Sequence, residues 1–186
     1  VSSLAWSRDS SQLAYSYRDE TTKSVRGRNI ADDTDTIYST DGSPLSSMDW
    51  SADGTKLVGV RWTKISRFDD RGSVDGIPKP TVKVVRRLRY KQDGVGWVHD
   101  RFTQIWVLEL TTGDFVQVTH SECDYSSPKW SNNGARLAFV GMAREQNIPL
   151  GYGQIFTCQF PDGHPQLLLK DWQGTAVSPM RGNDDK

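Results

Sequence analysis

Short apolar runs separated by polar turns follow one another along the chain. The three clearest runs read QLAYSY, KLVGVRW and RLAFVG, at residues 12–17, 56–62 and 136–141. Each run is rich in residues that favour β-strands, and nothing in the chain keeps a helical period. The pattern predicts an all-β protein in which these runs are inner strands buried on both faces.

Each run is preceded by a Trp-Ser pair and a short polar turn, and this makes an internal repeat. Trp6, Trp50 and Trp130 head the three copies, and a leucine follows seven residues later in each: Leu13, Leu57 and Leu137. The first two tryptophans are 44 residues apart and the last two are 80 apart, close to two periods. A repeat of about 40–45 residues with short strands is typical of a β-propeller blade. We expect the repeated tryptophans to pack between adjacent sheets.

A further unit is expected near residue 90, where the longer spacing leaves room for it. There Tyr90 stands in the place of the tryptophan, Asp93-Gly94 supplies the turn and Trp97 takes the leucine position. This segment is either a degenerate repeat or an inserted hairpin. A chain of 186 residues holds about four such units. We therefore expect one partial β-propeller domain over residues 1–186, of about four blades, from a larger propeller; the alternative is a complete four-bladed binding module.

The turns carry residues suited to tight hairpins. Asp53-Gly54 and Asn133-Gly134 each combine a hydrogen-bonding side chain with a residue that accepts positive φ, whereas Asp9-Ser10 is a poorer match. Two further hairpins are predicted around Thr112-Gly113-Asp114 and Pro161-Asp162-Gly163. Sheet built from hairpins is the structure that these signals favour.

Composition and charge narrow the function. The 23 basic and 23 acidic residues balance, which argues against nucleic acid as a partner because such proteins need a basic surface. No apolar run is long enough to cross a membrane, so no membrane partner is expected. The chain starts with Val, and we expect the true N-terminus to lie upstream. Cys123 and Cys158 could pair, but two buried thiols in a reducing compartment is the favoured interpretation.

Two clusters of potential ligands give only a weak signal for a metal site. His120, Glu122, Cys123 and Asp124 lie in the run HSECD, without further ligands at suitable spacing. The run 32–35 is rich in aspartate but lacks the glycine and the closing glutamate of a calcium loop. We expect neither a metal nor a cofactor.

Residues 64–82 interrupt the blade rhythm with charges, glycines and two prolines. We hypothesise that four charged residues of this insertion lie near a substrate entrance or a subunit contact: Arg67, Asp69, Asp70 and Arg71. An exposed loop without function is the alternative. Residues 19–36 and 142–152 read as further long loops.

The run 82–119 carries a resemblance to a known family. It contains R-L-x-Y-K-x-D-G-x-G, then an arginine, a Thr-Gly pair and Gln-x-Thr: Arg87, Leu88, Tyr90, Lys91, Asp93, Gly94, Gly96, Arg101, Thr112, Gly113, Gln117 and Thr119. The run resembles the propeller of prolyl-oligopeptidase-type serine peptidases, in the acylaminoacyl-peptidase and dipeptidyl-aminopeptidase branch. In SSPKWSNNGARLAF, Asn132-Asn133 replaces the Pro-Asp of that family's blade start.

The resemblance implies a propeller that caps the active site of an α/β-hydrolase domain in the same parent chain and admits only short peptides. It also implies a cytoplasmic serine peptidase. The chain has no G-x-S-x-G motif, so we expect no catalytic residue within it and no activity of the chain alone. Exposed blade edges could lead to homo-oligomers. The rival is a periplasmic propeller of the Tol-Pal type that binds proteins and has no enzyme attached.

Overall fold

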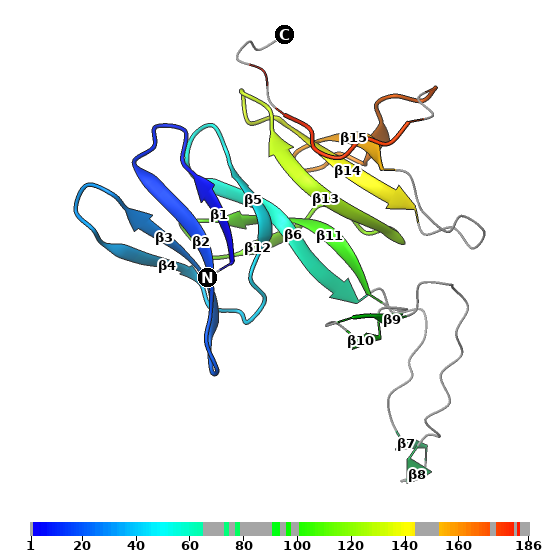
Figure 1. Ribbon diagram of the computed structural model, residues 1–186, viewed down its shortest axis with the longest axis horizontal. Coiled ribbons are helices and arrows are strands. Elements are labelled where there is room, and N and C mark those ends of the chain that lie inside the picture. The colour runs from blue at the N-terminus through cyan, green and yellow to red at the C-terminus, as the bar shows by residue number, and fades with distance from the viewer. Residues whose placement is uncertain are drawn as a thin grey trace.

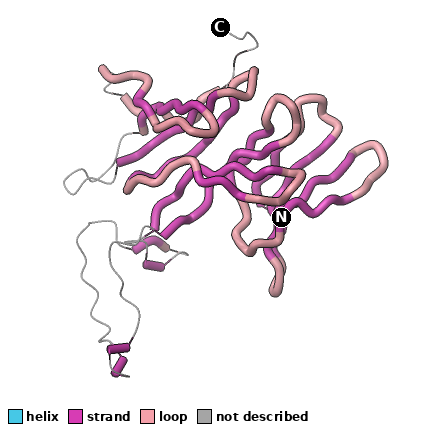
Figure 2. Tube along the Cα trace, turned by 180° about the vertical axis from the view of Figure 1, so that it is seen from behind, coloured by secondary structure: helices cyan, strands magenta, loops and turns pink. Residues whose placement is uncertain are grey.

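The protein is built from antiparallel sheets that fan out around one region (Figure 1). The computed structural model describes residues 2–64, 73–74, 77–78, 91–93, 96–97, 101–143, 153–171, 174–180 and 182. Among them, three sheets have four strands each and two sheets have two strands each, and no helix is present. Figure 2 shows the same sheets from behind.

Each four-stranded sheet follows the chain from its first to its last strand, as in a propeller blade. Blade 1 consists of β1 (Ser2–Trp6), β2 (Gln12–Arg18), β3 (Lys23–Asn29) and β4 (Asp35–Ser39). Blade 2 consists of β5 (Ser46–Trp50), β6 (Lys56–Lys64), β11 (Arg101–Glu109) and β12 (Phe115–Gln117). Blade 3 consists of β13 (Cys123–Trp130), β14 (Arg136–Ala143), β15 (Gln154–Gln159) and β16 (Gln166–Leu167). The expected all-β propeller fragment is confirmed.

The described residues form three blades, although the spacing of the repeats suggested about four. The second and third strands of blade 2 pair directly, and this pairing reaches Lys64 opposite Arg101. The intervening segment therefore joins two neighbouring strands of one sheet. Within it, β9 (Lys91–Gln92) and β10 (Gly96–Trp97) pair as a hairpin, as do β7 (Ser73–Val74) and β8 (Ile77–Pro78). Of the two interpretations for the unit near residue 90, the structure supports the inserted hairpin.

One turn geometry explains the repeated Trp-Ser motif. In blade 2 the Ser51 hydroxyl donates to Asp53 Oδ1 (2.6 Å) and accepts from the Lys56 amide (2.9 Å). Asp53 Oδ1 also accepts from the Thr55 amide (3.1 Å), and Gly54 takes a φ of 70°. The serine and aspartate side chains thus accept hydrogen bonds from backbone amides of the turn, and in this way they close the hairpin between the first two strands.

The other two blades repeat this turn with different residues. Ser7 and Asp9 form it in blade 1, and Ser131 and Asn133 form it in blade 3. Ser10 occupies the position of Gly54 at a φ of 60°. Ser10 was expected to suit this turn less well than glycine. The structure shows it in the left-handed region that glycine favours.

The core lies between the blades in two clusters. The cluster between blades 1 and 2 contains Trp50, and the cluster between blades 2 and 3 contains Trp130; each of these tryptophans is 2% exposed. Trp6 is 56% exposed. The expectation that all three tryptophans pack between sheets is wrong for Trp6, because no other described blade lies against its side of blade 1.

Both cysteines are free and buried, as the favoured interpretation expected. Cys123 begins β13, and Cys158 lies on β15 opposite Leu137. Burial raises the pKa of the Cys158 thiol to about 11. The described part of the chain contains no helix long and apolar enough to span a bilayer.

Candidate functional site

The first strands of the blades form the centre of the arrangement. Strand β5 contacts both β1 and β13, so the three lie side by side around one axis. Each contains one serine in the left-handed region, three residues before its tryptophan: Ser3 (φ 55°), Ser47 (φ 50°) and Ser127 (φ 50°). Pairing with the second strand of the blade shifts register at these points. Three blades therefore repeat the same β-bulge, a feature that bends a strand and redirects its side chains.

The long segments of the chain leave from the ends of the blades that lie opposite to the Trp-Ser turns. Ser46, next to one bulge, pairs with Val60 in the middle of β6, and the segment 65–100 follows Lys64 at the end of that strand. Ala143 at the end of β14 pairs with Cys123 at the start of β13, and the segment 144–152 follows. We call this end of the blades the bulge end. The opposite end carries the Trp-Ser turns.

The hypothesised site at Arg67, Asp69, Asp70 and Arg71 lies outside the described residues. The structure fixes where this segment joins the sheet, between Lys64 and Arg101, and so at the bulge end.

Polar groups tie the central strands of neighbouring blades together. Asp49 Oδ2 accepts a hydrogen bond from the Trp130 amide (2.9 Å), and Asp49 Oδ1 lies 3.2 Å from Lys129 Nζ. The Trp50 indole donates to the carbonyl of Ala5 (2.9 Å). Asp49 is 9% exposed, so its charge is held by specific partners rather than by water.

A second polar junction joins blades 2 and 3 where β11 meets the start of β13. The Thr103 amide donates to Asp124 Oδ1 (3.0 Å). The Gln104 side-chain amide donates to the carbonyls of Ser121 (3.0 Å) and Cys123 (2.8 Å), and Gln104 is fully buried. The run HSECD is therefore used to join two blades.

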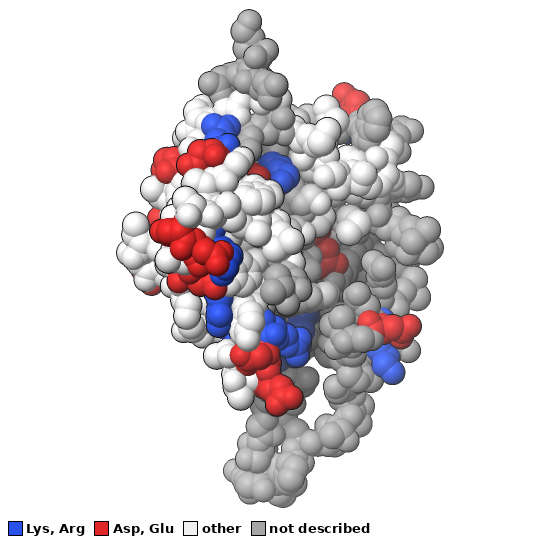
Figure 3. Space-filling view, turned by 60° about the vertical axis from the view of Figure 1, so that its left-hand side comes forward, with Lys and Arg blue, Asp and Glu red and all other residues white. Residues whose placement is uncertain are grey.

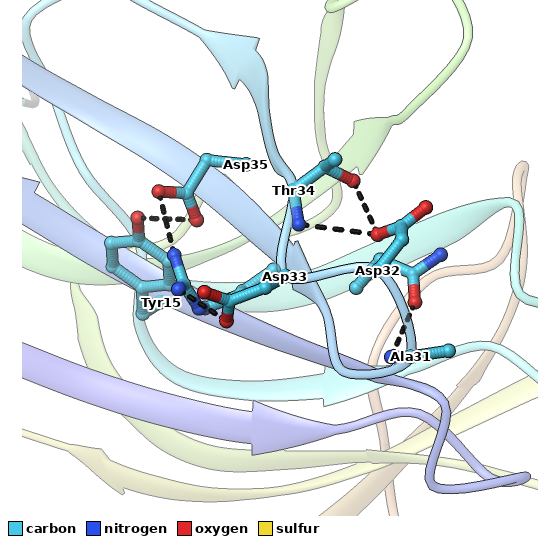
Figure 4. A network of polar contacts seen from close by, with 8 residues as sticks. Tyr15, Ala31, Asp32, Asp33, Thr34 and Asp35 are labelled. Atoms are coloured by element: carbon cyan, nitrogen blue, oxygen red, sulfur yellow. Dashed lines mark hydrogen bonds and ion pairs between the residues drawn. The ribbon is translucent and has the colours of Figure 1, made fainter.

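The aspartate-rich turn between β3 and β4 is held by ion pairing and hydrogen bonds. Arg28 pairs with Asp33 and, at 3.1 Å, with Asp35, whose other oxygen accepts from the Tyr15 hydroxyl (3.1 Å; Figure 4). Asp32 accepts from the amide and the hydroxyl of Thr34, and these bonds lower the pKa of Asp32. Acidic and basic side chains accordingly lie next to one another on this side of the molecule (Figure 3). Among the described residues, no group of three or more His, Cys, Asp or Glu could hold a metal ion.

The arrangement offers groups that form hydrogen bonds. At the bulges, the shifted register releases backbone amides and carbonyls of the first strands from regular pairing. Such groups form hydrogen bonds with an extended polar chain. The Asp49–Lys129 pair adds one charge of each sign on the same central strands.

Comparison with known proteins places this arrangement among propellers. No family model matches the chain. The uncharacterized peptidase YuxL of Bacillus subtilis (strain 168) is 30% identical over 91 residues, which are 48% of this chain and 14% of the relative. The acylaminoacyl peptidase of Pyrococcus horikoshii superposes with a TM-score of 0.61 at 16% identity, over 89% of this chain and 24% of that one.

A second kind of propeller is equally similar in fold. TolB of Acinetobacter baumannii superposes with a TM-score of 0.58 at 15% identity, over 96% of this chain and 34% of TolB. The chain has the β-propeller fold. The resemblance to peptidase propellers, expected from the sequence, is confirmed in the fold and in the similarity to a peptidase sequence. The chain spans about a seventh of the length of the curated relative.

Sequence reasoning missed the serine bulges, although a signal for them exists. Each of the three repeated tryptophans is preceded by the same pair of serines, in SSLAWS, SSMDWS and SSPKWS. The second serine of every pair is the residue with positive φ. If the repeat is defined by the Ser-Ser pair instead of the Trp-Ser pair, it marks the three positions of the bulges.

Proposed function

We propose that this chain is the non-catalytic propeller part of a serine peptidase similar to acylaminoacyl peptidase. In this proposal the propeller caps the active site of an α/β-hydrolase domain in the same polypeptide and restricts access to short peptides. The observation that carries the proposal is the 30% identity to a bacterial peptidase, combined with the propeller fold. The reaction would be acyl transfer by a serine nucleophile located outside these residues.

The geometry of the bulge end supports the gating role. A short peptide in extended form has free amides and carbonyls along its length, and in this proposal they would pair with backbone groups that the bulges release from the sheet. Both long segments, 65–100 and 144–152, join the blades at this end. Ties between the blades, such as Asp49 to Trp130, would keep the blades together so that larger polypeptides are excluded.

We further propose that the parent protein works in the cytoplasm. Two free, buried thiols are compatible with a reducing compartment, where disulfides do not persist.

The proposal is tested on the whole protein that contains residues 1–186. A fluorophosphonate probe, which labels activated serines, should label the whole protein at a position outside residues 1–186. The unlabelled enzyme should cleave short blocked peptides and leave a long unstructured polypeptide such as casein intact, and labelling should abolish the peptide hydrolysis. Absence of labelling together with absence of peptide hydrolysis would contradict the proposal.

The second candidate is a protein-binding propeller of the TolB type. It is favoured by one observation: TolB covers more of this chain, 96%, than the peptidase from Pyrococcus horikoshii does, 89%. The same probe separates the two, because a binding propeller has no activated serine. A protein that stays unlabelled and co-purifies with a defined partner would support this candidate.

A further inference from the structure

The turn of blade 3 differs from the other two in the residues that close it. Blade 3 carries Asn133-Gly134 where blade 2 has Asp53-Gly54 and blade 1 has Asp9-Ser10. Asn133 is the only asparagine of the sequence that is followed by glycine. Because glycine has no Cβ, its backbone nitrogen is unshielded and can reach the side-chain amide of the residue before it. This pair is therefore a candidate for loss of the asparagine amide.

The side-chain amide of Asn133 is held in a way that favours attack on its carbon. Its Oδ1 atom accepts hydrogen bonds from the Ser131 hydroxyl (2.8 Å) and from the Ala135 backbone amide (3.0 Å). Both donors draw electron density from the carbonyl, and both would stabilise the negative charge that develops on Oδ1 when a nucleophile adds. Asn133 is exposed, and its Nδ2 atom has no hydrogen-bond partner in the described part of the chain, so ammonia can leave into water.

The nucleophile is the backbone nitrogen of Gly134. This residue has a φ of 69°, and apart from its chain neighbours nothing lies within 4 Å of the position that a Cβ would take. Its N–H donates to the carbonyl of Ser131 (3.1 Å), so this one bond of the turn must open before the nitrogen can attack. The two hydrogen bonds to Oδ1 of Asn133 use other atoms and need not break at that moment.

We propose that Asn133 is a site of self-modification, at which the protein loses ammonia and gains a carboxylate. The nitrogen of Gly134 gives up its proton and bonds to Cγ of Asn133, the bond between Cγ and Nδ2 breaks, and Nδ2 leaves as ammonia with that proton. Water then opens the cyclic imide, either at Cγ to give aspartate or at the main-chain carbonyl to give isoaspartate. Water is the only co-reactant, and the reaction is independent of the proposed peptidase function.

The two products differ in their effect on the turn. Aspartate fits it, because Asp53 of blade 2 accepts the same two hydrogen bonds, from a serine hydroxyl (2.6 Å) and from a backbone amide (3.1 Å). Isoaspartate lengthens the main chain by one methylene and moves the carboxylate away from both donors. Either product places a negative charge next to Asn132, whose carbonyl accepts a hydrogen bond from Arg8 of blade 1 (3.3 Å). The modification therefore changes the charge at a contact between blades 1 and 3.

Peptide mapping of the whole protein tests the proposal. Trypsin cuts after Lys129 and Arg136, so one fragment carries both Asn132 and Asn133. The folded protein is kept at mildly alkaline pH for days and analysed by mass spectrometry. We expect the fragment to gain about 1 Da at Asn133 and to separate into two products, while Asn132 and Asn29 stay intact. If Asn133 stays intact in the folded protein and converts only in urea, the proposal is wrong.

Matched variants test whether the turn assists the reaction. Ser131→Ala removes one donor to Oδ1 of Asn133 and should slow the conversion roughly three- to ten-fold. Ser51→Ala removes the equivalent hydroxyl of blade 2 and should leave the rate at Asn133 unchanged. An equal or faster conversion in Ser131→Ala would overturn the assisting role of the turn. Asn133→Asp should show no further change in mass at this position and should melt no lower than the wild type at neutral pH; a lower melting temperature would contradict the fit of aspartate to this turn.

Discussion

Asp49 of β5 and Lys129 of β13 are 80 residues apart in the sequence and form an ion pair of 3.2 Å across the boundary between two blades. The same carboxylate accepts a hydrogen bond from the buried backbone amide of Trp130. One side chain thus joins two central strands, and the two halves of this contact differ in their surroundings. The Asp49 side chain is 12% exposed and the Lys129 side chain is 35% exposed.

This difference predicts unequal effects of removing the two partners. Asp49→Ala should lower the free energy of unfolding by about 2–3 kcal/mol, because the buried Trp130 amide loses a charged acceptor. Lys129→Met should cost under about 1 kcal/mol, the usual value of a partly exposed ion pair. Urea denaturation of both variants measures the difference. Equal losses would show that the ion pair, rather than the amide contact, carries the stability.

The two buried tryptophans differ in their polar partners. The Trp50 indole donates to the Ala5 carbonyl, whereas the Trp130 indole has no acceptor among the described residues. Trp50→Phe should therefore destabilise the protein by about 1 kcal/mol more than Trp130→Phe, the usual net value of one hydrogen bond. Thermal or urea unfolding of the matched pair tests this, and the reverse order of stability would contradict the contacts described.

Gly27 provides the room that one aromatic side chain needs. A Cβ at this position would lie 2.2 Å from the Tyr38 hydroxyl oxygen, and Tyr38 packs edge-on against Trp50. Gly27→Ala should lower the free energy of unfolding by about 1–3 kcal/mol through overpacking. Gly182→Ala is the matched control, since nothing lies within 4 Å of the added atom.

A double variant tests whether the loss at Gly27 comes from that clash. If it does, Gly27→Ala should cost far less in a Tyr38→Ala background, where the ring is absent. Additive losses in the double variant would place the strain elsewhere.

The repeated turn predicts a difference in acid sensitivity between blades. Hydrogen bonds from Ser51 and Thr55 lower the pKa of Asp53 from 3.8 to about 2. Because the pKa of Asp53 is lower in the folded protein than in the unfolded chain, the ionised carboxylate stabilises the fold. This stabilisation is complete at a pH above the pKa of Asp53 in the unfolded chain, and it is lost as the pH falls through the pKa of Asp53 in the folded protein. Because Asp53 is largely exposed, the effect should stay below about 1 kcal/mol.

Asn133, which does not titrate, holds the same place in blade 3. Asp53→Asn should keep the turn and remove its share of the stability loss between about pH 4 and pH 2. The reverse change, Asn133→Asp, should add such a loss. Urea midpoints across this pH range provide the measurement. An Asp53→Asn variant with an unchanged acid profile would show that this carboxylate has the same pKa in both states.

Burial of Cys158 predicts slow thiol chemistry. With the pKa raised to about 11, the thiolate is scarce at pH 8, and the side chain is also shielded. An aromatic disulfide reagent should modify Cys158 only as fast as the protein unfolds, and at once in urea. Immediate modification in the folded protein would contradict the buried position. The variant Cys123→Ala isolates the signal of Cys158.

The sequence by itself determined the strands, their turns and the fold. Alternating apolar runs give β-strands, and the Trp-Ser-x-Asp-Gly motif closes each hairpin through contacts within six residues, so both are local and readable. The all-β propeller fragment followed from these signals. The serine bulges were also readable, in the pair of serines before each tryptophan, but only with the knowledge that the pair takes positive φ.

Only the tertiary structure decided which repeats are blades and which tryptophans are buried. The spacing of 80 residues suggested a hidden blade, but the pairing of β6 with β11 makes it one blade with an insertion. Trp6, Trp50 and Trp130 have the same local sequence, yet one is 56% exposed and two are 2% exposed. The reason is physical: hydrogen bonding in a hairpin depends on neighbours in the chain, whereas burial depends on whether another sheet lies against the face, and no local pattern encodes that.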